Sequence, residues 1–369
     1  MRRHPPDYAL LAVVAGLLVF GLVMLTSATG PTGFQKFGDS YYFFKRQLFF
    51  GVLPGLVLLL ACMRLTVERL KSIAPLMLPA AAILLCLGFI PGLRAEYGSG
   101  SWINLFGASL QPSELAKLCL ILYFAWWFAR RDEESIKGFW TGFLPFTISI
   151  ALVIALMMLQ SDLGTTSVIV AFLFAMYIAA GASLKHLGAL FAAGFAMFLI
   201  FIKIAPYRVA RLEIFLRPDL DPQGVGYHIN QARLAIGSGG WFGLGLGKSR
   251  QKFQYLPEVA GDSIFAVISE ELGFLASAAV ILAFILLVRY GLKIAERSTD
   301  PFARAAAIGI SVWIGFQAVL NISAMVGLMP LTGVPLPFIS HGGSAMLANL
   351  MAIGILAAIS RESKVVRTH

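Results

Sequence analysis

The stretch YALLAVVAGLLVFGLVMLTSAT (residues 8–29) has no charged side chain over its whole length. A transmembrane helix needs about 20 predominantly apolar residues, because the hydrocarbon core is about 30 Å thick and an α-helix rises about 1.5 Å per residue. Further apolar stretches follow at 41–63, 72–92, 110–129, 139–159, 163–181, 184–205, 263–291, 302–326 and 340–360. We therefore predict an all-α polytopic membrane protein with about ten transmembrane helices.

The composition agrees with a chain embedded in lipid. Its 369 residues are 58% hydrophobic and 13% charged, which is too apolar for an ordinary soluble domain of this length. The net charge of +10 does not indicate nucleic acid, since the basic residues are not gathered with stacking aromatics on one face. Cys62, Cys86 and Cys119 lie in apolar runs and form neither a disulfide framework nor a zinc-binding spacing.

The positions of Lys and Arg predict the orientation, because basic loops are retained on the cytoplasmic side. Placing both termini in the cytoplasm puts the basic groups of 2–3, 64–71, 130–137, 289–304 and 361–367 on that side. The glycine- and proline-containing segment at about 206–262, between the seventh and eighth spans, is then extracytoplasmic. We expect interfacial or re-entrant segments there rather than a long regular helix, within a single transmembrane domain over 1–369.

Two pairs of polar residues stand close to the predicted spans on the outer side. Glu114 and Lys117 are three positions apart after Gln111-Pro112-Ser113, so a helix places them on one face as an ion pair. This pair either orients the helix or contacts a substrate, and the residues favour neither interpretation. The guanidinium groups of Arg208 and Arg211 suit bidentate contacts with phosphate, with solvated interfacial arginines as the plain alternative.

Two aspartates precede predicted helices at the outer face. Asp162, within Gln160–Thr165, is best explained as an N-cap of the following helix. Asp262 follows Leu256-Pro257-Glu258 and precedes the eighth span, with Glu270 and Glu271 further on. A carboxylate held partly out of water at a membrane boundary is suited to act as a general base, and an N-cap role is the competing interpretation.

A proline-rich segment, Pro330–Ser344, leads into the last span. Such backbone cannot face lipid, so it must line a protein-walled cavity or lie in the interface. Its His341 is explained equally well by a hydrogen-bonding or a catalytic role. The outer face thus collects carboxylates, arginines, a glycine-rich loop and a proline-rich loop, which predicts an outward-facing site for an anionic amphiphile rather than an ion pathway at the membrane midplane.

These motifs resemble the SEDS family of bacterial shape, elongation, division and sporulation proteins, typified by FtsW and RodA. The resemblance covers nearly the whole chain, and the motifs are specific by their number and order. They are Trp102–Leu105, Gln111–Lys117, Gln160–Thr165, Ala235–Gly240 with Gly243-Leu244-Gly245, Leu256-Pro257-Glu258, Asp262, Glu270–Gly273 and Pro335–Ser340 with Gly342-Gly343-Ser344.

The resemblance implies polymerisation of peptidoglycan glycan strands from lipid II, outside the bacterial cytoplasmic (inner) membrane, beside a class B penicillin-binding transpeptidase. It implies that Asp262 is the catalytic base. The expected substrate-binding residues are Arg208, Arg211, Glu114, Lys117, Lys252, Ser340, Gly342, Gly343 and Ser344, and the expected supporting residues are Asp162, Glu258 and Glu271. A divalent cation is a further expectation at the leaving group, although the sequence shows no dedicated ligand cluster and leaves the metal unassigned.

The chain departs from the family pattern around the carboxylate. Ala260-Gly261-Asp262-Ser263 stands where histidine-threonine-aspartate-phenylalanine is usual, Ser161 where proline is common, and His341 where tyrosine is common. Two other functions compete with the polymerase: a lipid II flippase or transporter, which needs a polar route open to the cytoplasm, and a non-catalytic scaffold that activates a transpeptidase, which has no need of Asp262.

Overall fold

The computed structural model describes residues 4–90, 101–105, 108–204, 215, 217, 224–253 and 255–363, and nearly all of their regular structure is helical. The helices are α1 Tyr8–Phe37, α2 Tyr42–Gln47, α3 Leu53–Arg64, α4 Val67–Ile73, α5 Met77–Leu87, α6 Pro112–Ala129, α7 Glu133–Lys137, α8 Leu144–Leu159, α9 Leu163–Ala179, α10 Leu184–Ile204, α12 Val225–Ser238, α13 Ile264–Arg297, α14 Pro301–Met325 and α15 Gly343–Glu362. Short π-helical or 3-10 turns at Leu48–Val52, Ala74–Leu76 and Phe139–Phe143 join α2 to α3, α4 to α5, and α7 to α8.

Each of the ten predicted spans coincides with a helix, or with two helices continued through one of these turns. Seven of the segments are long and apolar enough to cross a membrane: Tyr8–Phe37, Tyr42–Arg64, Val67–Leu87, Phe139–Leu159, Ile264–Arg297, Pro301–Met325 and Gly343–Glu362. The other three predicted spans are α6, which carries Glu114 and Lys117, and α9 and α10, which are apolar but shorter over their described residues. The predicted all-α polytopic membrane fold is confirmed.

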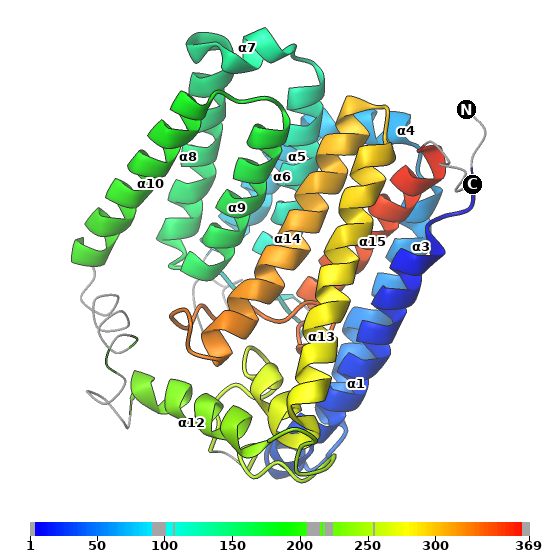
Figure 1. The fold of residues 1–369 in the computed structure, drawn as a ribbon, viewed down its shortest axis with the longest axis vertical. Helices are drawn as coiled ribbons and strands as arrows, with labels where there is room; N and C mark the ends of the chain where they lie inside the picture. The colour runs from blue at the N-terminus through cyan, green and yellow to red at the C-terminus, as the bar shows by residue number, and fades with distance from the viewer. Residues whose placement is uncertain are drawn as a thin grey trace.

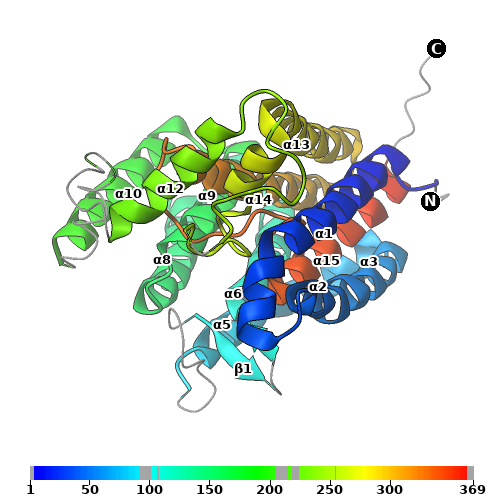
Figure 2. The same ribbon diagram turned by 90° about the horizontal axis from the view of Figure 1, so that it is seen from below.

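The helices form a bundle in which α14 and α15 are central (Figure 1). In their most apolar windows, 67% of α14 and 78% of α15 is buried inside the protein, against 39% for α1. The packing partners of α14 are α6, α9 and α13, and α15 packs along α3. The view from below in Figure 2 shows α1, α2 and α3 gathered around α15 on one side and α8, α9 and α10 on the other.

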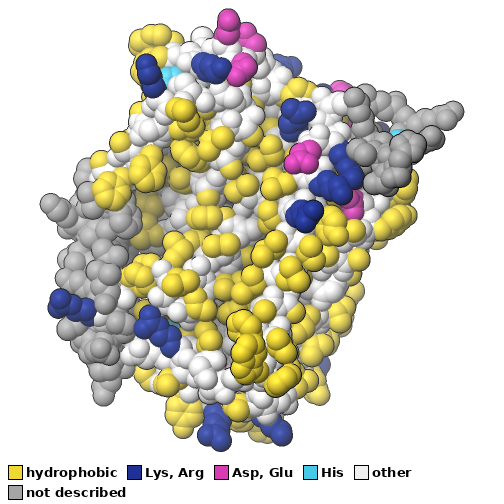
Figure 3. All heavy atoms as spheres, viewed as in Figure 1, with side chains coloured by type: hydrophobic (Ala, Val, Ile, Leu, Met, Phe, Trp, Pro, Cys, Tyr) yellow, Lys and Arg dark blue, Asp and Glu magenta, His cyan; other side chains and the backbone are white. Residues whose placement is uncertain are grey.

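The start of α1 and the end of α15 lie at one end of the bundle, and α12 lies across the other end (Figure 1). The amide of His4 donates to the Arg361 carbonyl at 2.9 Å, and the Asp7 amide donates to Ser360 Oγ at 3.1 Å, so the segment before α1 is joined to the end of α15. The space-filling view shows a largely hydrophobic surface between the two ends (Figure 3). This is the surface that a bundle immersed in lipid requires.

Two features add to the sequence-based expectation. The long loop contains one regular helix of 14 residues, α12, which lies across the end of the bundle as an interfacial segment would (Figure 1). In addition, β1 (Ile103–Leu105) and β2 (Ala108–Leu110) pair antiparallel immediately before α6.

Helix α13 is broken near its start at Gly273, whose φ of 76° and ψ of −172° are not helical. The glycine-rich loop completes the break: Leu244 N and Gly245 N donate to the carbonyls of Glu270 and Glu271, and the amides of Phe274 and Leu275 donate to Gly240 and Trp241. The loop therefore supplies hydrogen-bond partners that the helix itself has lost.

Candidate functional site

Asp262 lies in a tight turn, Pro257–Ser263, at the end of the bundle that carries α12. The amides of Gly261 and Ser263 both donate to the Glu258 carbonyl, at 2.9 and 3.3 Å. Glu258 has a φ of 48°, a left-handed conformation that is uncommon for residues other than glycine. Asp262 itself is half-buried and its Oδ1 atom is buried. The turn thus presents a carboxylate that is partly withdrawn from solvent.

The interpretation of Asp262 as an N-cap is wrong. Helix α13 begins at Ile264, its N-cap residue is Ser263, and no side chain makes a capping hydrogen bond there. The extra residue between Asp262 and the helix moves its carboxylate off the helix end. The carboxylate of Asp262 therefore does not cap α13.

Donors from distant segments hold three successive carbonyl groups of the turn. They are His341 N on Ala260 O (2.7 Å), Ser340 Oγ on Gly261 O (2.6 Å) and Asn321 Nδ2 on Asp262 O (2.8 Å). The same Asn321 amide group donates to Val334 O at 2.8 Å. Because each carbonyl is fixed separately, the backbone that carries the carboxylate is held in one orientation. We call these three donors, Asn321, Ser340 and His341, the clamp.

The proline-rich loop holds four predicted substrate-binding residues, and each makes a contact within the protein. Ser340 O accepts from Gln47 Nε2 (3.3 Å), Gly342 N donates to Gln47 Oε1 (3.0 Å), Ser344 Oγ accepts from Gln111 N (2.9 Å), and a Cβ atom added to Gly343 would lie only 3.3 Å from Phe50 O. These residues therefore join the start of α15 to α2 and α6. Their contact with substrate stays a prediction.

Glu114 and Lys117 form the predicted ion pair, and it is buried. Lys117 Nζ lies 2.9 Å from Glu114 Oε1, with side-chain exposures of 0% and 1%. The ammonium group also donates to Gln317 Oε1 at 2.7 Å and lies 4.8 Å from the centre of the Trp313 ring. The pair is thus part of a larger polar network in the core, as buried charges require.

A stripe of polar residues along α14 connects this network to the Asp262 turn, and sequence reasoning missed it. Trp313 Nε1 donates to Gln317 Oε1 at 2.8 Å, Gln317 Nε2 donates to Pro335 O at 3.0 Å, and Asn321 reaches the turn itself. Their spacing of four places them on one helix face. The signal was present, because Gln and Asn in a membrane span are costly unless they have partners.

The carboxylates of Glu270 and Glu271 accept hydrogen bonds from the glycine-rich loop and hold it in place. Glu271 accepts from Gly247 N (3.0 Å), from Ser27 Oγ of α1 (2.6 Å) and from Lys252 Nζ (2.8 Å). Lys252 is buried and also donates to the Gly247 carbonyl at 2.7 Å. Its ammonium group faces Glu271 rather than an open surface, so the predicted contact of Lys252 with substrate stays a prediction.

Of the three remaining predicted residues, the structure describes Asp162 but not Arg208 or Arg211. Asp162 Oδ1 accepts from Thr165 N at 2.9 Å and caps α9, and its Oδ2 accepts from Gln111 Nε2 at 3.0 Å. The capping interpretation of Asp162 is therefore confirmed. Arg208 and Arg211 lie outside the described residues.

His228 of α12 is a further residue that sequence reasoning missed. Its Nε2 lies 2.6 Å from Ser263 Oγ, which in turn donates to Pro257 O at 2.8 Å. Burial lowers the pKa of His228 from 6.5 to about 4. The imidazole beside the turn is therefore neutral at pH 7.

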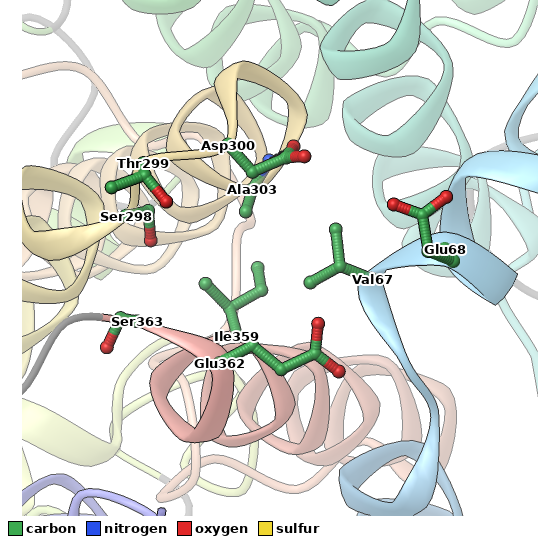
Figure 4. A pocket seen from close by; sticks show the side chains of 9 residues that line it. All are labelled: Val67, Glu68, Ser298, Thr299, Asp300, Ala303, Ile359, Glu362 and Ser363. Carbon is green, nitrogen blue, oxygen red and sulfur yellow. Dashed lines mark hydrogen bonds between the residues drawn. The ribbon is translucent and has the colours of Figure 1, made fainter. Parts of the chain in front are cut away.

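Within the described ranges, no group of three or more His, Cys, Asp and Glu side chains is arranged to hold a metal ion. The pocket in Figure 4 has a volume of about 60 Å³ and lies at the end of the bundle that carries the termini. It is lined by Val67, Glu68, Ser298, Thr299, Asp300, Ala303, Ile359, Glu362 and Ser363. It is therefore separate from the Asp262 turn.

The fold and this site define a polytopic helical membrane protein in which a hydrogen-bonded turn presents a half-buried carboxylate at one end of the bundle. Comparison with known families gives the particular family. A model of the FtsW/RodA/SpoVE family, described as "Cell cycle protein", matches residues 8–365. The chain belongs to this family, which is the one that its motifs resemble.

Relatives and solved structures agree with this assignment. The chain is 38% identical over 364 residues to stage V sporulation protein E of Bacillus subtilis (strain 168), covering 98% of this chain and 99% of that protein. It is 39% identical over 364 residues to a probable peptidoglycan glycosyltransferase FtsW of Trichlorobacter lovleyi, covering 97% and 94%. Its fold matches a chain of a peptidoglycan synthase complex (TM-score 0.80, 27% identity, 97% and 98% covered) and the rod shape determining protein RodA of Thermus thermophilus (TM-score 0.72, 26% identity, 98% of both chains).

Proposed function

We propose that this chain is a peptidoglycan glycosyltransferase that polymerises lipid II into β-1,4-linked glycan and releases undecaprenyl pyrophosphate. The observation that carries the proposal is the clamped, half-buried Asp262 in a member of the FtsW/RodA/SpoVE family. Relatives named as probable peptidoglycan glycosyltransferases, together with the likeness to a peptidoglycan synthase complex, support the same reaction class.

In the proposed reaction, Asp262 is the general base. Its carboxylate takes the proton from the 4-hydroxyl of the acceptor sugar while that oxygen attacks the anomeric carbon of the donor. The bond from this carbon to the pyrophosphate oxygen breaks, and the electron pair leaves with undecaprenyl pyrophosphate. Attack from the opposite face turns an α-linked donor into a β-linked product.

The surrounding residues are assigned supporting roles. Arg208 and Arg211 would compensate the charge that develops on the pyrophosphate, a role that a divalent cation would share. The buried pair of Glu114 and Lys117 holds α6 against α14 beneath the site through Gln317. By fixing the position of α14, this pair keeps Asn321 within hydrogen-bonding distance of the turn.

The proposed location is the bacterial cytoplasmic membrane, with both termini in the cytoplasm and the Asp262 turn outside. The terminal end of the bundle is held by basic residues: Arg361 Nη1 donates to Met63 O at 3.1 Å, and Lys71 pairs with Asp300. Basic residues at one end favour its cytoplasmic location. A class B penicillin-binding transpeptidase is the proposed partner, supported by the likeness to a chain of a synthase complex.

The proposal is tested by reconstituting the protein with its cognate transpeptidase in liposomes that contain lipid II. Wild type and Asp262→Asn are compared for glycan length on gels, with melting temperature as the folding control. Polymer from the wild type alone supports a polymerase with Asp262 as the base. Polymer from both proteins removes Asp262 from the chemistry. No polymer from either, but flipped lipid II or an activated transpeptidase, would favour a transporter or a scaffold.

A further inference from the structure

The clamp fixes the Asp262 turn from α14 and the proline-rich loop, and α12 makes a separate contact with the turn. His228 belongs to α12, the helix within the long loop, and its Nε2 lies 2.6 Å from Ser263 Oγ. Ser263 directly follows Asp262 and is fully buried. This contact joins the helix that lies across the end of the bundle to the residue beside the proposed base.

The hydrogen-bond pattern determines which atom donates. Ser263 has a single hydroxyl proton, and Pro257 O, 2.8 Å from Ser263 Oγ, is a carbonyl oxygen that only accepts. That proton therefore goes to Pro257 O, and His228 Nε2 must carry the proton that it donates to Ser263 Oγ. His228 of α12 therefore donates to Ser263 Oγ, and Ser263 Oγ donates to Pro257 O. The second bond joins the last residue of the turn to its first.

The contacts of Ser263 take the place of the N-cap hydrogen bond that its position would otherwise favour. Serine is a favoured N-cap because its hydroxyl oxygen accepts a free amide at the helix start. Ser263 is the N-cap residue of α13, yet it makes no capping hydrogen bond, since its hydroxyl lies between His228 and Pro257. The hydroxyl therefore stabilises the turn and its link to α12 rather than the helix.

We propose that His228 is a positioning residue for the glycosyl transfer, which orients the Asp262 carboxylate by holding the turn through Ser263. This inference rests on the proposed function and deepens it. The His228–Ser263 pair gives this chain a polar connection between its long loop and the turn that carries the proposed base.

The test is a double-mutant cycle in proteoliposomes with lipid II and the partner transpeptidase. We expect His228→Ala to lower kcat at least about tenfold with KM for lipid II changed less than about twofold, because substrate contacts are unaffected while the base is misplaced. His228→Gln should recover part of the rate, since its amide also donates. Ser263→Ala should resemble His228→Ala, and the double variant should lose no more than either single variant. Asn230→Ala, on the same helix, is the matched control and should keep the wild-type kcat.

A second measurement needs no activity. Hydrogen exchange of the amides at 258–263 should be faster in His228→Ala than in wild type, with the melting temperature unchanged and the α14 amides equally protected. Wild-type kcat in His228→Ala, additive losses in the double variant, or unchanged exchange in the turn would each overturn the inference. If wild type makes no glycan while the exchange difference holds, the proposed function fails and the structural link stands.

Discussion

Asn321 Nδ2 lies 2.8 Å from the backbone carbonyl oxygen of Asp262, a residue 59 positions earlier in the chain. The same amide group reaches Val334 O at 2.8 Å, so one side chain of α14 ties together the turn that carries the proposed base and the proline-rich loop. Through Gln317, α14 also contacts the buried Lys117. The central helix of the bundle is thus the element against which the site is assembled.

Replacing Asn321 by aspartate should show whether its donated hydrogen bonds, and not only its size, are needed for activity. Asn321→Asp keeps the size but removes both donors, and it sets a carboxylate against two carbonyl oxygens. Loss of hydrogen bonds to buried carbonyls costs roughly 1–3 kcal/mol each. We expect glycan synthesis to fall at least about tenfold in the reconstituted assay, with protein still folded by fluorescence-detected size exclusion. A wild-type rate in this variant would contradict the clamp.

Removing the ammonium group of Lys117 alone should destabilise the protein far more than removing both charges of the ion pair. Lys117→Met leaves the Glu114 carboxylate buried without its cation, which costs roughly 3–5 kcal/mol in buried pairs. Lys117→Met combined with Glu114→Gln should restore most of this loss. Melting temperature in detergent measures both. Lys137→Met, which breaks the exposed pair with Glu133, is the control and should leave the melting temperature unchanged.

Gly243 should tolerate no side chain, because the loop and the broken start of α13 touch there. A Cβ atom on Gly243 would lie 2.2 Å from the Glu271 carbonyl oxygen, and its φ of 78° is unfavourable for alanine. Strain of this kind alone costs roughly 1–3 kcal/mol. Gly243→Ala should therefore lower both melting temperature and polymerase rate. Gly237→Ala, in open space within α12, should be neutral or stabilising by up to about 1 kcal/mol, and equal effects of the two would refute the packing argument.

Acidification should destabilise the folded protein through His341. Burial, with a contribution from nearby Arg46, lowers the pKa of His341 from 6.5 to about 4 in the folded protein. Between these values the unfolded chain binds more protons, so the free energy of unfolding falls as the pH falls from about 6.5 towards 4. By pH 5 the loss from this group is about 2 kcal/mol. Melting temperature measured from pH 7 to 5 should fall more steeply in wild type than in His341→Gln, and parallel curves would show that His341 does not titrate in this way.

The sequence predicts many of the residues of the candidate site, but it does not predict how they contact one another in space. Glu114 and Lys117 were correctly paired, because helix spacing alone brings positions three apart together. The cap at Asp162 was correct for the same local reason. The choice at Asp262 stayed open, since one residue more or less before a helix decides whether a carboxylate caps it.

The apolar runs of the chain are enough to predict its helices and their place in a membrane, because a long apolar run in hydrocarbon satisfies its backbone hydrogen bonds only by forming a helix. The surroundings of Asp262, in contrast, depend on tertiary packing. Asn321, Ser340 and His228 come from three separate segments, 59, 79 and 35 positions from their partners in or beside the turn. Contacts over such separations depend on how helices rotate and pack against one another. Hydrophobic burial and the directionality of hydrogen bonds settle that packing jointly, and no local pattern in the chain encodes it.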